Sequence, residues 1–297
     1  MSGGVAGRLP CVGIHLVLSF MLRACRARAV GTALEKKLGW RLSEAVRIER
    51  MDLGLSNANF KVICADQGPV FLREYGNVEG AFNPHEQHIR DSGIGAELLE
   101  HFEWGHLEAW IPGRPMRRQD CNDAGTLAQV AAALRRLHDV SQRNHNDLNF
   151  TNIHLHRPAD GSPIQAHFVD FEYAGELDVP LELANFFSEW MYDHTQPTQW
   201  FEPDMTLFPS KEQAWLFVGE YLGPAASESE ISHLLQEVER RVPEVHQRWI
   251  DWTHTHFPHD EIYLKYAERR RAMLAEGVPM VTNEAIVVTQ GSGLAFD

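Results

Sequence analysis

The sequence predicts an α+β fold in which a small antiparallel sheet comes first and a larger, mainly helical part follows. Two strand-length runs, Phe60 to Ala65 and Val70 to Glu74, are separated by the turn Asp66-Gln67-Gly68. Beyond residue 122, apolar side chains recur at helical spacing instead. The segment from Pro112 to Pro115 separates the two patterns, so we expect two lobes that meet at residue 112.

Composition limits the partners of the chain. The 297 residues carry a formal net charge of -14, so no nucleic-acid partner is expected, and the acidic character suits a small cationic substrate. The cysteines have no paired spacing, which indicates a reduced, cytoplasmic setting. They are Cys11, Cys25, Cys64 and Cys121.

The first 34 residues contain no acidic side chain. Their apolar run, Cys11 to Leu22, is too short to span a bilayer and contains His15, so we predict no stable membrane insertion. An arginine-rich, acid-free segment fits a targeting leader, and it equally fits an extension outside the first lobe. We therefore divide the chain into 1–34, a sheet lobe 35–112, a helical lobe 113–276 and a tail 277–297.

One polar stretch between two predicted strands carries the chemistry. Asp147 is followed by Asn152, and a strand, a turn and a return strand bring Asp170 back beside that amide. This set suits phosphoryl transfer: Asp147 accepts the proton of an attacking hydroxyl, and Asn152 and Asp170 hold Mg²⁺ on nucleotide phosphates. The alternative is a polar loop between buried strands with incidental acids.

The motifs of this stretch resemble the choline/ethanolamine kinase family, whose relatives are the aminoglycoside phosphotransferases and the protein kinases. They read His145-Asn-Asp-Leu-x-x-x-Asn152 and Val169-Asp-Phe-Glu-Tyr173, and the likeness extends from Gly39 to Leu274. It implies a bilobal, protein-kinase-like fold and ATP-dependent phosphorylation of an amino alcohol. Residues Phe186 to Asp193 resemble the choline kinase branch, and this implies phosphocholine formation on the route to phosphatidylcholine.

The resemblance also implies a nucleotide site in the sheet lobe. Ser56 and Asn57 belong to a small-residue turn that would cover the nucleotide, and Arg73 would contact its phosphates. Glu86 has two interpretations, a helix cap or the partner that orients Arg73, and we favour the second. Backbone groups of Ala109 and Ile111 would meet the adenine edge.

A receptor for the trimethylammonium group is implied in the helical lobe. Trp249 and Trp252 are three residues apart on one helical face, and Tyr263 follows on the next helix. Tyr173 would close this aromatic box and Glu189 would add negative charge. Aromatic faces suit a quaternary ammonium because it has no hydrogen to donate. The alternative is that these tryptophans are core residues, on a helix kinked or broken at Pro243.

Two departures from the family pattern shape the alternatives. Several tens of residues that precede the catalytic loop in the family are missing between Val140 and His145. Glu182 stands where the family commonly has aspartate, near a position that supports the loop. We expect that the shortened approach impairs activity. A non-catalytic partner that binds nucleotide or dimerises is therefore the alternative from another class, and ethanolamine kinase is the alternative among enzymes. A homodimer is compatible with either.

Overall fold

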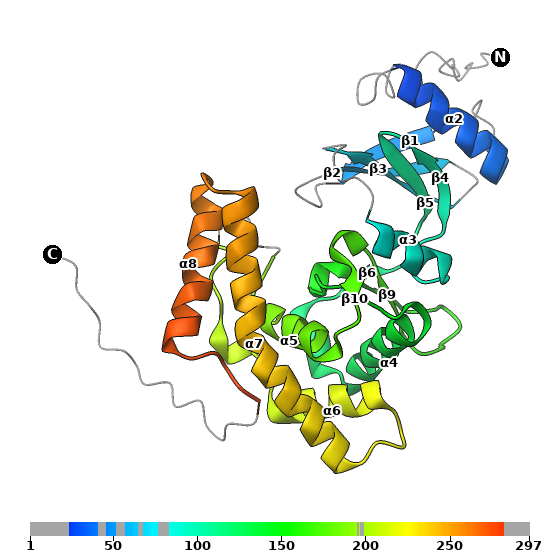
Figure 1. Ribbon diagram of the computed structural model, residues 1–297. Coiled ribbons are helices and arrows are strands. Elements are labelled where there is room, and N and C mark those ends of the chain that lie inside the picture. Colours follow the sequence, from blue (N-terminus) through cyan, green and yellow to red (C-terminus); the bar gives the residue numbers. More distant parts are fainter. Residues whose placement is uncertain are drawn as a thin grey trace, which may run out of the picture. The chain divides into compact units, whose positions relative to one another are not determined.

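The computed structural model describes residues 24–40, 46–51, 57–64, 68–76, 83–194, 196 and 199–281. The chain divides into two compact units, Met1–Pro112 and Gly113–Asp297 (Figure 1). An antiparallel sheet dominates the described part of the first unit, and helices dominate that of the second. The predicted α+β class is confirmed.

The first unit is built on a five-stranded sheet with the strand order β1-β2-β3-β5-β4, in which all neighbours are antiparallel. The two predicted strands form β2 and β3, whereas β1 was not predicted. The elements are α2 (Ala24–Leu38), β1 (Val46–Met51), β2 (Asn57–Cys64), β3 (Val70–Tyr75), α3 (Pro84–Asp91), β4 (Leu98–Phe102) and β5 (Gly105–Ala109).

Helix α2 covers one face of this sheet (Figure 1). Its side chains Val30, Ala33 and Leu34 are buried against apolar residues of the strands, which include Phe60 and Leu72. The boundary that we drew at residue 34 therefore falls inside a helix, and Val30, Ala33 and Leu34 contribute to the core of the first unit. Apolar burial of this kind is the main stabilising contribution in a small lobe.

The second unit packs its helices around α5, with two small sheets beside them. Its elements are β6 (Arg114–Pro115), η1 (Arg118–Asn122), α4 (Ala124–Ser141), β7 (Arg143–Asn144), η2 (Phe150–Asn152), β8 (Ile153–His156), β9 (Gln165–Phe168), η3 (Phe171–Tyr173), β10 (Gly175–Glu176), α5 (Val179–Glu189), η4 (Met205–Leu207), α6 (Lys211–Leu222), α7 (Glu228–His256) and α8 (Glu261–Glu276).

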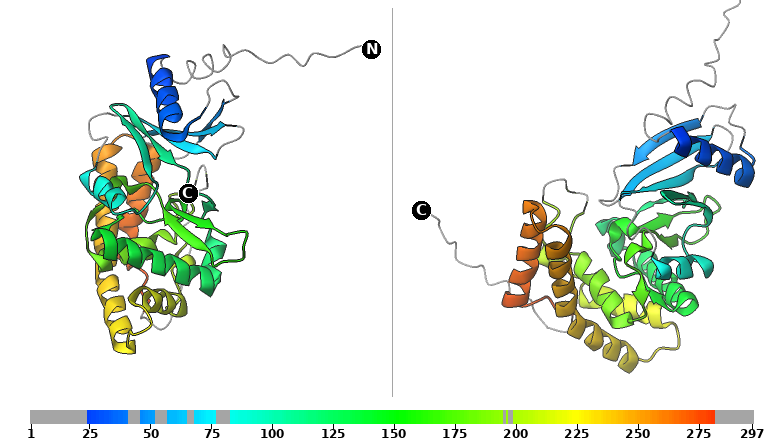
Figure 2. Two further views of the ribbon diagram at one scale, coloured as in Figure 1. Left: turned by 90° about the vertical axis from the view of Figure 1, so that its right-hand side faces the viewer. Right: turned by 45° about the horizontal axis from the view of Figure 1, so that its top comes forward.

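Helix α5 is the centre of this unit, because every side chain from Glu182 to Glu189 is buried. The apolar stripe predicted for α4 faces inward as expected, with Leu127 and Leu134 fully covered. Figure 2 shows α8 lying antiparallel beside the later half of α7. These helices hold the loops between β7 and α5, where the predicted catalytic residues lie.

A kink or a break is expected at Pro243, and of these the break does not occur, because helix α7 continues through this proline. Proline removes one intrahelical hydrogen bond and its ring crowds the preceding turn. Here Val242 and Val245 on either side are fully buried, while Pro243 itself is exposed. Packing on the inner face therefore keeps one helix where the local sequence favours two.

None of the helices in the described ranges is long and apolar enough to cross a membrane.

Candidate active site

The predicted catalytic acid and its amide partner lie on the loop between β7 and β8. The Nδ2 atom of Asn152 donates to Oδ2 of Asp147 at 3.0 Å and to the Asp147 carbonyl at 2.9 Å. Asn149 accepts the N–H of Thr151 at 2.9 Å and so caps the short turn η2 that carries Asn152. Because an amide group is planar, this donation directs the Oδ1 atom of Asn152 away from Asp147.

Asp170 reaches the same place through the backbone of the return strand. In the β8–β9 pair, Ile153 lies opposite Phe168, and the next N–H, that of Val169, donates to the Asn152 carbonyl at 3.0 Å. Asp170 has a left-handed backbone with a φ of 67°, which is uncommon for a residue with a side chain and is typical of functional loops. The predicted hairpin thus brings Asp170 beside Asn152.

The carboxyl of Asp147 has a strongly perturbed pKa. Burial raises this pKa well above its usual value, and the negative charges of Glu189 and Asp170 add to the effect. Arg248 lowers it, but by less. A raised pKa moves a carboxyl towards the range in which it accepts a proton efficiently near neutral pH, which is the property that a general base requires.

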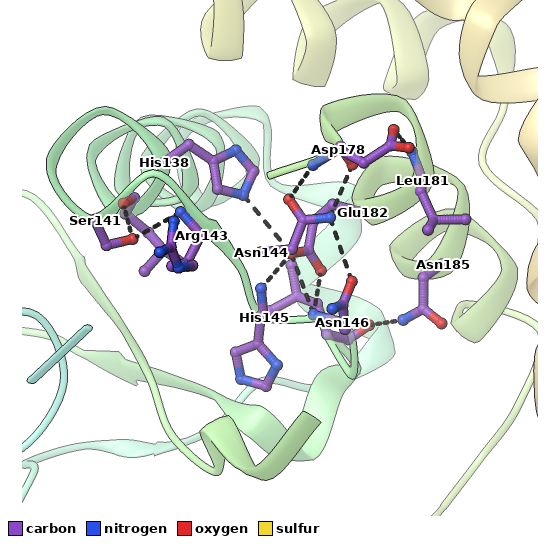
Figure 3. Close-up of polar contacts among 12 residues, drawn as sticks. His138, Ser141, Arg143, Asn144, His145, Asn146, Asp178, Leu181, Glu182 and Asn185 are labelled. Carbon is purple, nitrogen blue, oxygen red and sulfur yellow. Dashed lines mark hydrogen bonds and ion pairs between the residues drawn. The ribbon is translucent and has the colours of Figure 1, made fainter. Parts of the chain in front are cut away.

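Glu182 holds the backbone just before Asp147 (Figure 3). This fully buried carboxylate accepts the N–H of His145, and it accepts the N–H of Asn146 at 3.1 and 3.2 Å. Burial opposes ionisation, yet His138, His145 and the amide of Asn146 bring the pKa of Glu182 below its usual value. The glutamate that replaces the expected aspartate therefore caps two amides of the loop that carries Asp147.

The short approach to the loop is made of regular structure. Helix α4 extends to Ser141, and Gln142 adopts a left-handed backbone with a φ of 55° that ends it. β7 follows and pairs with β10. Asn144 exchanges two hydrogen bonds with the backbone of Asp178, at 2.8 and 3.0 Å (Figure 3). Short regular elements therefore bridge residues 139–144, and nothing in the described ranges supports impaired activity.

The four predicted aromatic residues come together on α7, α8 and η3. Ring centroids lie 5.5 Å apart for Trp249 and Trp252, 5.8 Å for Tyr173 and Trp249, and 5.8 Å for Trp252 and Tyr263. The indole N–H of Trp252 donates to the hydroxyl of Tyr173 at 3.0 Å. Phe257, which the sequence did not single out, stacks on Tyr263 at 3.9 Å. Tyr263 thus joins the cluster from α8.

Glu189, which is predicted to add negative charge beside the aromatic box, forms ion pairs with two other side chains. It forms an ion pair of 2.5 Å with the buried Arg270 and one of 2.7 Å with His194. Burial opposes ionisation, but Arg270 and His194 lower the pKa of Glu189 to about 2. Its negative charge is still felt at Asp147, where it raises the pKa. The sequence did not reveal Arg270.

Of the predicted nucleotide turn, Ser56 lies outside the described residues. Asn57 begins β2 opposite Tyr75, and its side-chain oxygen accepts the N–H of Gly76 at 3.3 Å. Asn57 therefore lies at the end of the β2–β3 pair where β2 begins and β3 ends.

Arg73 and Glu86 are both buried in the first unit. Burial raises the pKa of Tyr75 to about 12, Glu86 adds to this shift and Arg73 opposes it, so both charges lie within electrostatic reach of that tyrosine. Glu86 accepts a hydrogen bond of 2.6 Å from Arg90, and Asn83 caps α3 instead by accepting the N–H of His85 at 2.9 Å. The pairing of Glu86 with Arg73 stays a prediction.

The two backbone positions predicted to meet adenine differ in their surroundings. Ala109 ends β5, and its N–H already donates to the carbonyl of Glu97 at 2.9 Å. That N–H is therefore already engaged in a backbone hydrogen bond and is not available to donate to adenine. Ile111 lies beyond the strand and is half-buried.

The donor set at the loop fits Mg²⁺ rather than a protein-encased metal. Among the described residues, no group of three or more His, Cys, Asp or Glu side chains could hold a metal ion. Mg²⁺ needs fewer, because it is usually bound by one or two protein oxygens together with phosphate and water. Asn152, with its Oδ1 turned from Asp147, and Asp170 would offer such oxygens.

Two side chains that touch the loop were missed. Asn185 donates to the Leu148 carbonyl at 3.3 Å, and Arg248 donates to the Asn146 carbonyl at 2.5 Å. Asn185 stands in an apolar helical pattern that reads as core. Arg248 directly precedes Trp249, and an arginine on a long amphipathic helix is ordinarily solvated.

Comparisons with known proteins agree with this geometry. The choline/ethanolamine kinase family model matches residues 48–145 and 142–275, so its two matched stretches join where the approach to the loop is short. A probable choline kinase of Arabidopsis thaliana is 25% identical over an alignment of 246 residues that covers 62% of this chain and 70% of that protein.

Two solved structures share the fold. A choline kinase from Cryptosporidium parvum has a TM-score of 0.68 and 15% identity, and the match covers 84% of this chain and 94% of that one. A Plasmodium vivax ethanolamine kinase has a TM-score of 0.67 and 16% identity, with coverage of 92% and 97%. With a family model that covers most of the chain, the conclusion is direct: this protein belongs to the choline/ethanolamine kinase family.

Proposed function

We propose that the protein transfers the γ-phosphoryl group of ATP to the hydroxyl of choline. The observation that carries this is the direct contact of the acid-bearing loops with the aromatic cluster. Tyr173 ends the turn that Asp170 begins, and its hydroxyl accepts from Trp252. Burial raises the pKa of Tyr173, and the charges of Glu172 and Asp147 raise it further, so the aromatic cluster lies within reach of the catalytic carboxylate.

The residues divide the work as follows. The choline oxygen attacks the γ-phosphorus, its proton passes to Asp147, and the bond to the bridging oxygen breaks as ADP leaves. Asn152 and Asp170 would hold Mg²⁺, which neutralises charge on the phosphate oxygens. Arg73 is proposed to steady the phosphates. Binding choline against the aromatic rings places its hydroxyl for attack.

Choline is preferred over ethanolamine on the chemistry of the aromatic cluster. A primary ammonium needs acceptors for three N–H groups, whereas a trimethylammonium needs only polarisable faces, each worth about 2 kcal/mol when desolvated. The cluster offers four rings, and Glu189 is already engaged by Arg270. Ethanolamine kinase is the second candidate, since the fold is shared equally with a structure of that activity.

An ADP-release assay with choline and ethanolamine side by side tests the proposal. We expect turnover with choline to exceed that of Asp147→Asn at least a hundredfold, because a positioned general base contributes about 10²–10⁴ in rate. Equal rates for the wild type and D147N with both substrates would refute the proposal that the protein catalyses phosphoryl transfer. A clear preference for ethanolamine would refute the choline assignment alone.

The non-catalytic alternative rests on the short approach to the loop. Glu182 accepts the N–H groups of His145 and Asn146, so the loop is held in place without the missing segment, and the main argument for the non-catalytic alternative is lost. Calorimetry that shows ATP binding, together with no turnover of either substrate, would restore it. Location in the cytoplasm and dimerisation belong to this proposal as well and are tested by fractionation and by sedimentation.

A further inference from the structure

Arg248 lies on α7 directly before Trp249 and reaches across to the catalytic loop. Its Nη2 atom donates to the backbone carbonyl of Asn146 at 2.5 Å and to Oδ1 of Asn185 at 2.9 Å. Its guanidinium carbon lies 5.0 Å from the ring centroid of Trp249. The side chain therefore joins three elements: α7, α5 and the loop before Asp147.

The carbonyl that Arg248 binds belongs to the peptide whose N–H is that of Asp147. Asn146 holds a left-handed backbone with a φ of 65°, which is unfavourable for most residues with a side chain. The carboxylate of Glu182 accepts the backbone N–H of Asn146, and the Nδ2 atom of Asn146 donates to the Tyr173 carbonyl at 3.1 Å. Arg248 fixes the remaining backbone group, and with it the plane of the Asn146–Asp147 peptide.

A second contact supports the other side of Asp147. Asn185 donates to the carbonyl of Leu148 at 3.3 Å, while its Oδ1 accepts from both Arg248 and the indole N–H of Trp249, each at 2.9 Å. The carbonyls before and after Asp147 are thus held by two side chains that bond to each other. One of them is adjacent in sequence to the aromatic cluster.

We propose that Arg248 is a positioning residue for Asp147: it holds the Asn146–Asp147 peptide so that the carboxylate faces the substrate hydroxyl. The proposal rests on the phosphotransfer function proposed above. A misplacement of about 1 Å in a catalytic group can cost on the order of a hundredfold in rate. Arg248 acts through the peptide and contacts no reacting atom, so the loss is expected in kcat rather than in substrate binding.

Steady-state kinetics of Arg248→Met separate this role from a general loss of structure. Methionine keeps the length and packing of the side chain and removes its donors. We expect kcat to fall at least tenfold while KM for ATP and for choline changes less than threefold. Arg240→Met on the exposed side of the same helix, where the arginine pairs with Glu237, should behave as wild type. A kcat of R248M within twofold of wild type would overturn the proposal, and so would a parallel rise in both KM values.

Hydrogen exchange gives a readout that does not depend on turnover. In R248M the amides of residues 144–149 should exchange at least tenfold faster than in wild type and R240M, while exchange in α4 and α6 stays unchanged. Arg248→Lys, which keeps one donor group, should lie between the two, and it also serves if R248M fails to fold. Unchanged exchange in R248M, or in R248K where only it folds, would overturn the positioning role even if the wild type proves inactive. An inactive wild type with faster exchange in the variant would refute the proposed function alone.

Discussion

Replacing Glu182 by glutamine tests how the catalytic loop is held. The carboxylate accepts two backbone amides, and glutamine can offer an oxygen to only one while its NH₂ group faces the other. A hydrogen bond to a charged group contributes about 1.5–3 kcal/mol, so the loss of the charge and of one acceptor should lower the free energy of unfolding by about 3 kcal/mol. At about 2–4 °C per kcal/mol, the melting temperature should fall by about 6–12 °C.

Thermal and urea unfolding followed by circular dichroism would measure the loss in E182Q. The exposed Glu220→Gln on α6 is the matched control, with no change expected. Because the pKa of Glu182 is lowered in the folded state, its stabilisation is complete above the usual glutamate pKa and is lost as pH falls through the lowered value. The difference between wild type and E182Q should therefore shrink in acid. An E182Q variant as stable as E220Q at pH 7 would contradict the capping role.

Three further outcomes are expected. Trp252→Leu should raise KM for choline about tenfold or more, because one desolvated aromatic face contributes about 2 kcal/mol, and it should change KM for ethanolamine less. Equal effects on the KM of both substrates, measured by ADP release, would contradict the role of the aromatic cluster as a choline receptor. Asp170→Asn should raise the Mg²⁺ concentration for half-maximal turnover about tenfold, as titration from an EDTA-treated enzyme would show, and an unchanged requirement would remove Asp170 from the metal site. Burial and the neighbouring Arg270 lower the pKa of His246 to about 3, so the folded state is most stable above pH 6.5 and loses about 1.4 kcal/mol per pH unit below it. Between pH 6.5 and 4.5, the urea midpoint of His246→Gln should therefore fall less steeply with falling pH than that of the exposed His233→Gln. An equally steep fall in both variants would contradict the lowered pKa of His246.

The sequence was informative where local pattern decides structure. The hairpin that carries Asn152 and Asp170, the strands around residues 60 and 72, and the start of α7 at Ser227 all follow from turn and capping chemistry. The aromatic cluster was predicted through the resemblance, because spacing alone does not distinguish a receptor from a core.

Other features depend on contacts that are distant in sequence. Arg248 meets Asn146, which precedes it by 102 positions, and Arg270 meets Glu189, which precedes it by 81. No local pattern indicates such partners. Of the kink or break expected at Pro243, the break does not occur, because burial of the flanking valines outweighs the local cost of the proline. Glu182 was noticed as a departure, but only its position beside two amides showed what the longer side chain does.

The helix that begins at Ala24 has a practical consequence for anyone who shortens this polypeptide. Cutting the chain to begin at Glu35, which its arginine-rich start invites, would strip Val30, Ala33 and Leu34 from the sheet and leave Phe60, Val62 and Leu72 facing water. Uncovered β-sheet surfaces of this kind promote self-association. Such a protein would precipitate for reasons unrelated to its chemistry, and its inactivity would say nothing about the catalytic loop.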